Sequence, residues 1–359
     1  MSHRVINWGT GNVGYYALRA AINHPDLELV GLHAHSEAKQ GRDAGDIAGL
    51  DIETGVLATN DVDALLALKP DAVIYTANGE LRPDDAVADM SRILRAGINI
   101  VGIALIYMIY PPHGKPGIRE PLEAAAREGG STLFINGIDP GFSGDVLPLA
   151  ALQLADQVTE IRVQEICDYS TYEDPEFTGV AFGFGQPPEA EPLMSIPGVL
   201  ADGWGSMVEM VAAALGVKLE GLQERYLREY ASEDFSTPMM DIKAGTCSAV
   251  RFELEGIVNG KPLIVTEHVN RMALDQAPEW PAAPAGRRGV HRVIVTGNPS
   301  VQLECFVTGE DGDHNTGGVQ ATAMRVINAI PEVVAHAPGL VSTLDLPYTP
   351  SKHLITGAA

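Results

Sequence analysis

The stretch that decides the fold lies near the N-terminus and reads Val5-Ile6-Asn7-Trp8-Gly9-Thr10-Gly11-Asn12-Val13-Gly14. The apolar run at its start predicts a buried strand over residues 4–8, and the spacing that follows predicts a helix over residues 12–23. Between them stand three glycines in the order Gly-x-Gly-x-x-Gly. After a strand and before a helix, this spacing is typical of a loop that holds a dinucleotide pyrophosphate.

Each glycine has its own role in such a loop. Gly9 permits the tight turn, Gly11 lets the backbone approach the pyrophosphate, and Gly14 allows close packing of helix on strand. Free N–H groups at the positive end of the helix favour the phosphate charge. The alternative is a glycine turn without a ligand. The expected cofactor-binding residues of the loop are Gly9, Thr10, Gly11, Asn12, Val13 and Gly14.

Apolar runs and amphipathic segments alternate along the rest of the N-terminal part. Their order predicts the βαβ units of a parallel sheet. The predicted strands cover residues 4–8, 27–33, 72–76, 99–103 and 132–135, and the predicted helices cover residues 12–23, 62–68, 84–96 and 118–128. This succession is typical of a doubly wound α/β domain, the Rossmann fold.

The pattern changes after residue 145. Alternation over residues 158–166 is followed by two hairpin signals, at Asn259-Gly260 and at Asn298-Pro299. Together they predict an open, mainly antiparallel sheet with strands over residues 158–166, 250–258, 263–272, 290–296 and 301–308. Residues 172–197, rich in Pro, Gly and Glu, are expected to form a long loop. Helical spacing returns over residues 317–330 and is expected to stop at Pro331.

These patterns predict an α/β protein in three parts. Residues 1–145 are expected to form the dinucleotide-binding Rossmann domain, and residues 146–315 an α+β substrate domain with the open sheet. Residues 316–359 are expected to form a C-terminal helix and tail that pack back on the Rossmann domain.

Composition excludes several classes of protein. The 359 residues include 24 basic and 47 acidic ones, a formal net charge of −23 at pH 7. Such acidity repels nucleic acid and anionic membrane surfaces, so a small-molecule substrate is expected. Cys167, Cys247 and Cys305 form no CxxC pair, which argues against a disulfide framework and a cysteine zinc site. The N-terminus has no signal-peptide pattern, and a cytoplasmic location is expected.

The choice between NAD and NADP depends on the end of the second predicted strand, about 20 residues beyond the glycine loop. No acidic residue closes that strand. After it come His35, the hydroxyl of Ser36, and the cations of Lys39 and Arg42, which suit a 2′-phosphate. Glu37 could instead reach a ribose hydroxyl. These residues favour NADP, with NAD as the alternative.

Two further strand ends are candidate cofactor contacts, because ligands of doubly wound sheets bind beyond the carboxyl ends of the strands. Thr76, Ala77 and Asn78 end the third predicted strand, and Asn136 ends the fifth. The competing interpretation of residues 76–78 is a strand-end turn. Residues 139–141, Asp-Pro-Gly, are interpreted as a domain-boundary turn.

Motifs along nearly the whole chain resemble a known family. The glycine loop with residues 41–45, Gly-Arg-Asp-Ala-Gly, is similar to the N-terminal domain of dihydrodipicolinate reductases. Residues 136–142, 318–324 and 328–331 resemble 2,4-diaminopentanoate dehydrogenase and the native amine dehydrogenases grouped with it. The resemblance implies a Rossmann domain, a mixed sheet domain that covers the nicotinamide and serves dimerisation, a homodimer, and hydride transfer to a C=N or C=O carbon.

The chain departs from that family in two respects. It lacks the His-His pair and the Lys of dihydrodipicolinate reductases in the expected substrate domain. The amine dehydrogenases carry a Glu-Glu pair after the fourth strand, but the matching residues 103–112 are apolar here, among them Leu105 and Ile106. The acid that would handle the amine is therefore missing from its expected place.

Three residues of the substrate domain are the candidate catalytic residues. Period two puts Glu165 and Tyr169 on one face of their strand, where Glu165 could replace the missing acid and Tyr169 could donate a proton. His268 could act as an acid–base group because imidazole titrates near neutral pH. The competing interpretations are a solvated or salt-bridged Glu165 and a hydrogen-bonded sheet histidine.

The sequence therefore predicts an NAD(P)H-dependent oxidoreductase that transfers a hydride to an imine. The reaction would be the reductive amination of a small ketone or aldehyde with ammonia, or the reverse oxidation of an amine. Two alternatives stay open, a carbonyl or alcohol oxidoreductase without amine chemistry and a non-catalytic dinucleotide sensor. No metal site is expected. His33, His35 and His113 are possible metal ligands, but no further ligand lies at a sequence spacing that would complete a site with them.

Overall fold

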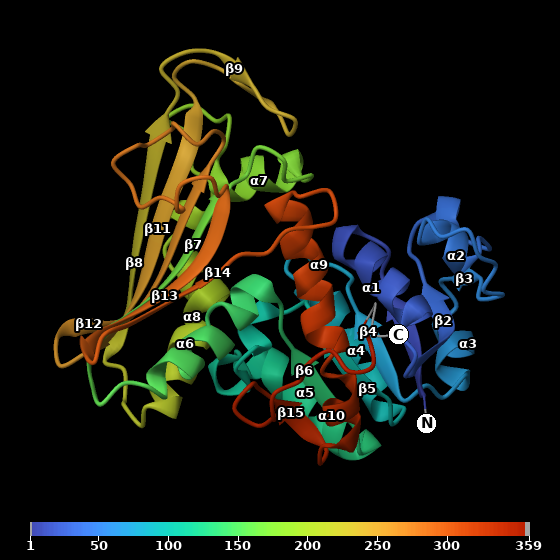
Figure 1. Ribbon diagram of the computed structural model, residues 1–359. Helices are drawn as coiled ribbons and strands as arrows, with labels where there is room; N and C mark the ends of the chain where they lie inside the picture. The colour runs from blue at the N-terminus through green and yellow to red at the C-terminus, as the bar shows by residue number, and fades with distance from the viewer. Residues whose placement is uncertain (1, 356–359) are drawn as a thin grey trace. The chain divides into compact units, whose positions relative to one another are not determined.

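The computed structural model describes residues 2–355 and divides into two units (Figure 1). The first unit comprises Met1–Ile138 together with Val319–Ala359, and the second comprises Asp139–Gly318. The sequence predicted the boundaries between these parts at residues 145 and 315, a few residues from the observed ones. Among residues 2–355, none of the helices has the length and the apolar character needed to cross a membrane.

The first unit is built on a seven-stranded sheet in the order β15-β6-β5-β4-β1-β2-β3, and all of its pairings are parallel. Its strands are β1 (His3–Trp8), β2 (Leu27–His33), β3 (Ala58–Thr59), β4 (Ala72–Tyr75), β5 (Asn99–Gly102), β6 (Thr132–Ile135) and β15 (Gly339–Val341). Its helices are α1 (Asn12–Asn23), α2 (Ala44–Ile47), α3 (Val62–Ala67), α4 (Pro83–Arg95), α5 (Pro116–Gly129) and α10 (Ile330–Ala335). The strand order, with its reversal between β1 and β4, confirms the predicted Rossmann fold.

The sequence explains why these elements form where they do. Every residue of β4 and β6 is buried, as expected for parallel strands covered on both faces. Helix α4 starts at Pro83, whose missing N–H costs nothing in the first turn, and acidic residues at its beginning and arginines at its end match the helix dipole. Its buried stripe includes Met90, Ile93 and Leu94.

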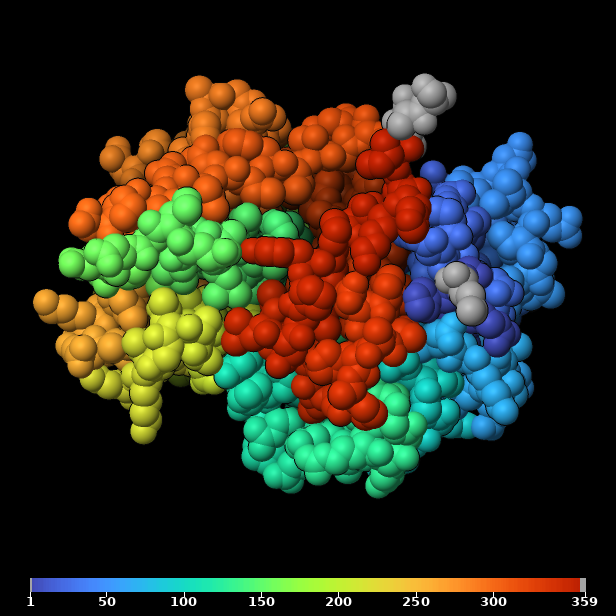
Figure 2. All heavy atoms as spheres, turned by 60° about the horizontal axis from the view of Figure 1, so that its bottom comes forward, coloured from blue at the N-terminus to red at the C-terminus, as the bar shows by residue number. Residues whose placement is uncertain are grey.

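The C-terminal segment belongs to the core of the first unit. Helix α9 (His314–Ile327) and α10 contribute buried apolar side chains to the cluster that contains Val5, Ala17 and Phe134. Strand β15 pairs with β6 in parallel. In Figure 2 the red atoms of this segment lie against the teal and blue atoms of the same unit. Pro331 was expected to end a helix, but it stands in the first turn of α10, where proline is favoured.

The second unit is built on a six-stranded sheet in the order β14-β13-β7-β12-β11-β8. Its pairings are antiparallel except that of β7 with β12, which is parallel. The strands are β7 (Gln157–Asp168), β8 (Gly221–Tyr230), β11 (Cys247–Val258), β12 (Lys261–Arg271), β13 (Gly289–Asn298) and β14 (Val301–Cys305), with a separate pair β9 (Phe235–Ser236) and β10 (Asp241–Ile242). The helices are α6 (Val146–Leu152), α7 (Pro175–Phe182) and α8 (Val199–Ala214).

The long loop expected over residues 172–197 was wrong in part, because α7 lies within it. Asp174 accepts a hydrogen bond from the backbone N–H of Phe177, and Pro175 follows at the first helical position, so this short helix has a capped start. Gly183, with a positive φ of 82°, ends it. Proline and glycine, which predicted a loop, here mark the two ends of a helix.

The two faces of the second sheet differ in character. One face, which we call the helical face, packs against α6 and α8 (Figure 1). The opposite face, the charged face, carries an ion-pair network in which Glu267, only 1% exposed, contacts Arg162 and Arg251. Residues that alternate along β7 therefore meet very different surroundings.

We expect Ile330→Ala to destabilise the protein by about 2–5 kcal/mol, because this fully buried side chain of α10 leaves a cavity in the first core. Urea unfolding would measure the loss. Leu81→Ala, at a side chain that is 68% exposed in the same unit, should change the free energy of unfolding by at most about 0.5 kcal/mol. Equal stabilities of the two variants would contradict the core position of α10.

Candidate active site

The register of the second sheet brings a carboxylate between two histidines. Glu165 on β7 lies opposite His268 on β12 and opposite His291 on β13. On the next strand along, Phe252 of β11 lies opposite His268. All four side chains are buried and share the helical face, since residues paired across strands point the same way.

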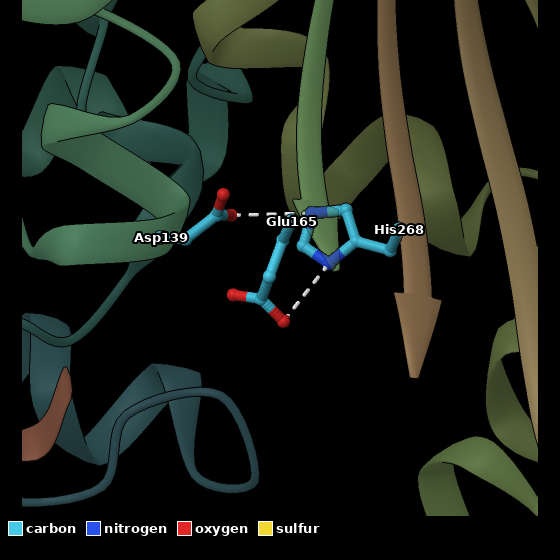
Figure 3. A group of neighbouring side chains, drawn as sticks. All are labelled: Asp139, Glu165 and His268. Atoms are coloured by element: carbon cyan, nitrogen blue, oxygen red, sulfur yellow. Dashed lines mark ion pairs between the residues drawn. The ribbon is translucent and has the colours of Figure 1, made fainter. Parts of the chain in front are cut away.

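A third acidic residue completes a compact group that we call the clamp: Asp139, Glu165 and His268 (Figure 3). The Nε2 atom of His268 lies 3.3 Å from an oxygen of Asp139, and its Nδ1 atom lies 3.4 Å from Oε1 of Glu165. The side chain of Asp139 is fully buried, and that of His268 is 2% exposed. One imidazole ring therefore faces a carboxylate at each of its two nitrogens.

Charge pairing decides the protonation of the clamp. Burial by itself would lower the pKa of His268, but the two carboxylates raise it to about 10. Burial would raise the pKa of Asp139, and the His268 charge lowers it to about 2. The pKa of Glu165 also lies below its ordinary value, because the His268 charge outweighs the effect of burial. At neutral pH the clamp thus holds two carboxylates and one imidazolium, a net charge of −1.

Neutral donors hold the two carboxylates in place. Asp139 accepts hydrogen bonds from the indole Nε1–H of Trp204 at 2.9 Å and from the hydroxyl of Ser143 at 2.5 Å. Glu165 accepts hydrogen bonds from the hydroxyl of Tyr169 at 2.8 Å and from the amide of Asn270 at 2.9 Å.

The two oxygens of Glu165 have different surroundings. Both of its hydrogen bonds and its contact with His268 go to Oε1. Within residues 2–355, no hydrogen bond reaches Oε2, which points away from the imidazole in Figure 3. A buried and ionised carboxylate thus keeps one oxygen for a further donor.

Aromatic rings surround this carboxylate. Tyr169 stacks on Tyr172 with ring centroids 5.1 Å apart, and Phe182 meets Tyr169 edge-on at 5.5 Å. Phe252 stacks on His268 at 4.4 Å with an angle of 11° between the rings. These rings, with Phe184 and Trp204, give the clamp apolar surroundings that strengthen its electrostatics.

The clamp is arranged as an ion-pair triad, and its three ligand atoms also lie close enough to one another, all within 4.8 Å, for a metal ion. A metal ion bonds one nitrogen of an imidazole, and here the two carboxylates face opposite nitrogens of the ring.

The glycine loop of the first unit fits a dinucleotide. Gly9 has φ of 111°, a value that favours glycine, and a side chain at Gly14 would come within 2.4 Å of the Gly9 carbonyl oxygen. At Gly11, the residue before α1, an added Cβ would have no neighbour within 4 Å, which leaves space for a close ligand. A pyrophosphate would meet the free N–H groups of Asn12 and Val13 in the first turn of α1.

The other sequence-predicted cofactor residues lie at strand ends of the first unit. Thr76 directly follows β4 and its hydroxyl donates a hydrogen bond to the Trp8 carbonyl, while Ala77 and Asn78 are progressively more exposed. Asn136 lies buried just after β6. These positions are consistent with cofactor contact at the carboxyl edge of the sheet.

The segment after β2 contains both ordered and exposed candidates. The ammonium group of Lys39 donates hydrogen bonds to the carbonyl oxygen and the hydroxyl of Thr10, at 2.8 and 3.0 Å, so it lies on the glycine loop itself. Arg42 pairs with Asp46, and both are exposed. His35 and Ser36 are also exposed.

Sequence reasoning identified three side chains that the structure brings together, Glu165, Tyr169 and His268. It gave no catalytic role to Asp139, for which a turn at the domain boundary was the favoured interpretation. Asp139 does begin the second unit, and its carboxylate also closes the clamp. Strand period alone could have placed Asn270 on the same face as His268, because the two residues stand two positions apart on one strand. The position of His291 opposite Glu165 could not have been found in this way, because it depends on how the strands pair.

Comparisons with known proteins agree with this architecture. The family model described as the 2,4-diaminopentanoate dehydrogenase C-terminal domain matches residues 142–356. An amine dehydrogenase of Streptomyces virginiae is 43% identical over 346 residues, 96% of each chain. The 2,4-diaminopentanoate dehydrogenase of Acetoanaerobium sticklandii is 24% identical over 258 residues, 71% of this chain and 68% of that relative.

A solved structure shares the fold. The amine dehydrogenase of Mycobacterium smegmatis aligns with a TM-score of 0.76 over 98% of this chain and 97% of that chain, at 19% identity. The family resemblance seen in the sequence motifs is confirmed by the family model and by the relative that is 43% identical. On the match of its second unit and the identity along its length, this protein belongs to the 2,4-diaminopentanoate dehydrogenase family.

Proposed function

We propose that this protein is an NAD(P)-dependent amine oxidoreductase that interconverts a small apolar amine with its ketone or aldehyde and ammonia. The observation that carries the proposal is the free Oε2 oxygen of Glu165, a buried carboxylate kept ionised by His268. The names of the relatives, amine dehydrogenase and 2,4-diaminopentanoate dehydrogenase, support the same reaction class.

The chemistry of the clamp suits a cationic nitrogen. Its net charge of −1 favours an ammonium or iminium group, and a hydroxyl or carbonyl compound would gain much less from it. Oε2 of Glu165 can accept one N–H of such a group as a charge-assisted hydrogen bond. The rings of Tyr169 and Phe182 offer apolar contact to the rest of the molecule.

Each residue of the site has a separate role in this reaction. Bound nicotinamide would exchange a hydride with the carbon that carries nitrogen. Glu165 holds the nitrogen and stabilises the positive charge of the iminium that forms. The pKa of Tyr169 is raised well above its usual range by burial and by Glu165, so its phenol stays protonated and keeps Oε1 occupied. His268 keeps Glu165 ionised. Asp139 contributes only by raising the pKa of His268, because its own charge raises the pKa of Glu165.

The lowered pKa of Glu165 limits its part in proton transfer. A weakly basic carboxylate does not retain a proton at neutral pH, so we assign to Glu165 the orientation of the amine and the stabilisation of its positive charge. Glu165 thus takes the place of the acid that the family carries near residues 105–106, on a different element of the fold.

We further propose NADP as the preferred cofactor and a homodimer as the assembly. The first rests on Lys39 at the glycine loop and on the absence of an acidic residue at the end of β2. The second rests on the family resemblance.

The reaction is tested by following reduced nicotinamide with a panel of small ketones, with and without ammonium. Turnover that requires ammonium is expected. Glu165→Gln should lower kcat/KM for amination by about 100-fold or more, because the neutral amide no longer stabilises the iminium charge. Glu160→Gln, on the same strand but 35% exposed and paired with Arg162, is the matched control and should retain activity. Ketone reduction without ammonium would instead indicate a carbonyl reductase, and dinucleotide binding without turnover a sensor.

The pKa shifts predict how the clamp stabilises the fold at different pH. Because the folded-state pKa of His268 is raised from 6.5 to about 10, its contribution is complete below pH 6.5 and is lost as pH rises toward 10. Because that of Asp139 is lowered from 3.8 to about 2, its contribution is present above pH 3.8 and is lost as pH falls toward 2.

Urea unfolding across pH checks this. The stability advantage of the wild type over His268→Gln should be greatest between pH 4.5 and 6.5, where both carboxylates and the imidazolium are fully charged, and should shrink toward pH 10. His336→Gln, outside the clamp, should follow the wild-type curve. A pH-independent difference between wild type and His268→Gln would contradict the charged clamp.

Cofactor preference is tested at Lys39. Lys39→Ala should weaken NADPH binding by about tenfold and NADH binding much less, because a 2′-phosphate loses a charged partner. Fluorescence titration of both reduced cofactors measures the ratio. Lys218→Ala, an exposed lysine of the second unit, is the control. If affinity for NADPH and for NADH fell equally, Lys39 would stabilise the glycine loop without contacting the 2′-phosphate.

A further inference from the structure

A second charged cluster lies on the charged face of the second sheet, opposite to the clamp along β7. The loop between β12 and β13 folds over this face, where Trp280 and Ala283 pack against Ile166, Val269 and Val290. Beneath the loop is a cavity of about 190 Å³, lined by Asp168, Arg271 and residues 282–288. At about 30 Å³ for each water in the liquid, this is the volume of roughly six water molecules.

Arg271 is the unusual residue of this cavity. It is 4% exposed, and in the described part of the chain no carboxylate lies within ion-pair distance of it. Its Nε and one terminal nitrogen donate to the carbonyl oxygens of Gln276, Ala277, Trp280 and Pro281, at 2.8 to 3.2 Å. No hydrogen bond within residues 2–355 involves its other terminal nitrogen, Nη1. Burial lowers the pKa of Arg271, and the nearby charge of Asp168 acts in the opposite direction without cancelling this effect.

The remaining charges around the cavity are also mostly positive. Arg288 pairs with Asp168, whose other oxygen accepts the N–H of Ser170 at 2.8 Å. Arg287 lies with its guanidinium 4.7 Å from the ring centroid of Phe306 and pairs with no acid among the described residues. Three arginines against one aspartate leave a net charge of +2, in a chain whose total is −23.

We propose that this cavity is a binding site for a small oxyanion, a compound that carries a phosphate or carboxylate group. A buried guanidinium without an acidic partner is costly, and an oxyanion would supply both the counter-charge and acceptors for the free Nη1 donors. Arg287 at the exposed rim would make the second contact. The site is separated from the clamp by the sheet itself, because Asp168 and Arg271 point away from the face that carries Glu165 and His268.

The test compares phosphate binding to two charge-reversal variants by calorimetry. Arg287→Glu should weaken binding of inorganic phosphate to this site by about tenfold or more. Lys261→Glu, an equal change of charge at the other end of β12, should bind as the wild type does. Any phosphate held by the glycine loop affects both variants equally and cancels in the comparison.

Hydrogen–deuterium exchange then locates the ligand. Phosphate should slow exchange of the segment 282–288 in the wild type and in Lys261→Glu but not in Arg287→Glu. A carboxylate such as citrate, used as a second probe, shows whether the site prefers phosphate or accepts either group. Phosphate affinity that is unchanged by Arg287→Glu, or exchange that slows only outside residues 282–288, would overturn the proposal.

Discussion

The second unit depends on one imidazolium held between two buried carboxylates. Removing Asp139 and Glu165 from water is costly unless a positive charge lies within contact distance, and His268 supplies that charge to both. The three groups set one another's protonation: the carboxylates raise the pKa of the imidazole, and its charge lowers theirs. Replacing His268 by a neutral residue would leave two carboxylates without a counter-charge in an aromatic environment, so the clamp is a constraint on the fold as much as a feature of the site.

In our proposal, the clamp also supplies the acid that this chain lacks at the position expected from the family resemblance. Residues 103–112 are apolar here, and Ala104, Leu105, Met108 and Ile109 are buried in the first unit. The acid that we assign to the amine stands instead on β7, in the middle of the second sheet. A central strand is a rigid support, and the hydrogen bonds from Tyr169 and Asn270 leave Glu165 little freedom to turn.

Both faces of the second sheet use buried charge, in different ways. On the helical face the net charge is −1 and one carboxylate oxygen is free for a cationic nitrogen. On the charged face Arg271 is caged by carbonyl oxygens and keeps an unsatisfied positive charge next to a cavity. Because successive side chains of a strand point to opposite faces of the sheet, the two charged groups are separated only by the thickness of the backbone. Neighbouring residues such as Cys167 and Asp168 therefore lie on opposite faces.

The sequence by itself determined the local elements and the faces of the strands. The glycine loop, the alternation of apolar runs and the hairpin signals predicted most of the strands in both sheets, because these depend on neighbours within a few residues. Period two put Glu165 and Tyr169 on one face. The helix α7 inside a Pro- and Gly-rich segment, and the second role of Asp139, were not predicted. Only the tertiary structure decided which charges meet: Asp139, Glu165 and His268 are far apart in the chain, and the parallel pairing of β7 with β12, which no local pattern encodes, brings His268 opposite Glu165. The pKa values follow from that contact, since they depend on distance and burial and not on the order of residues.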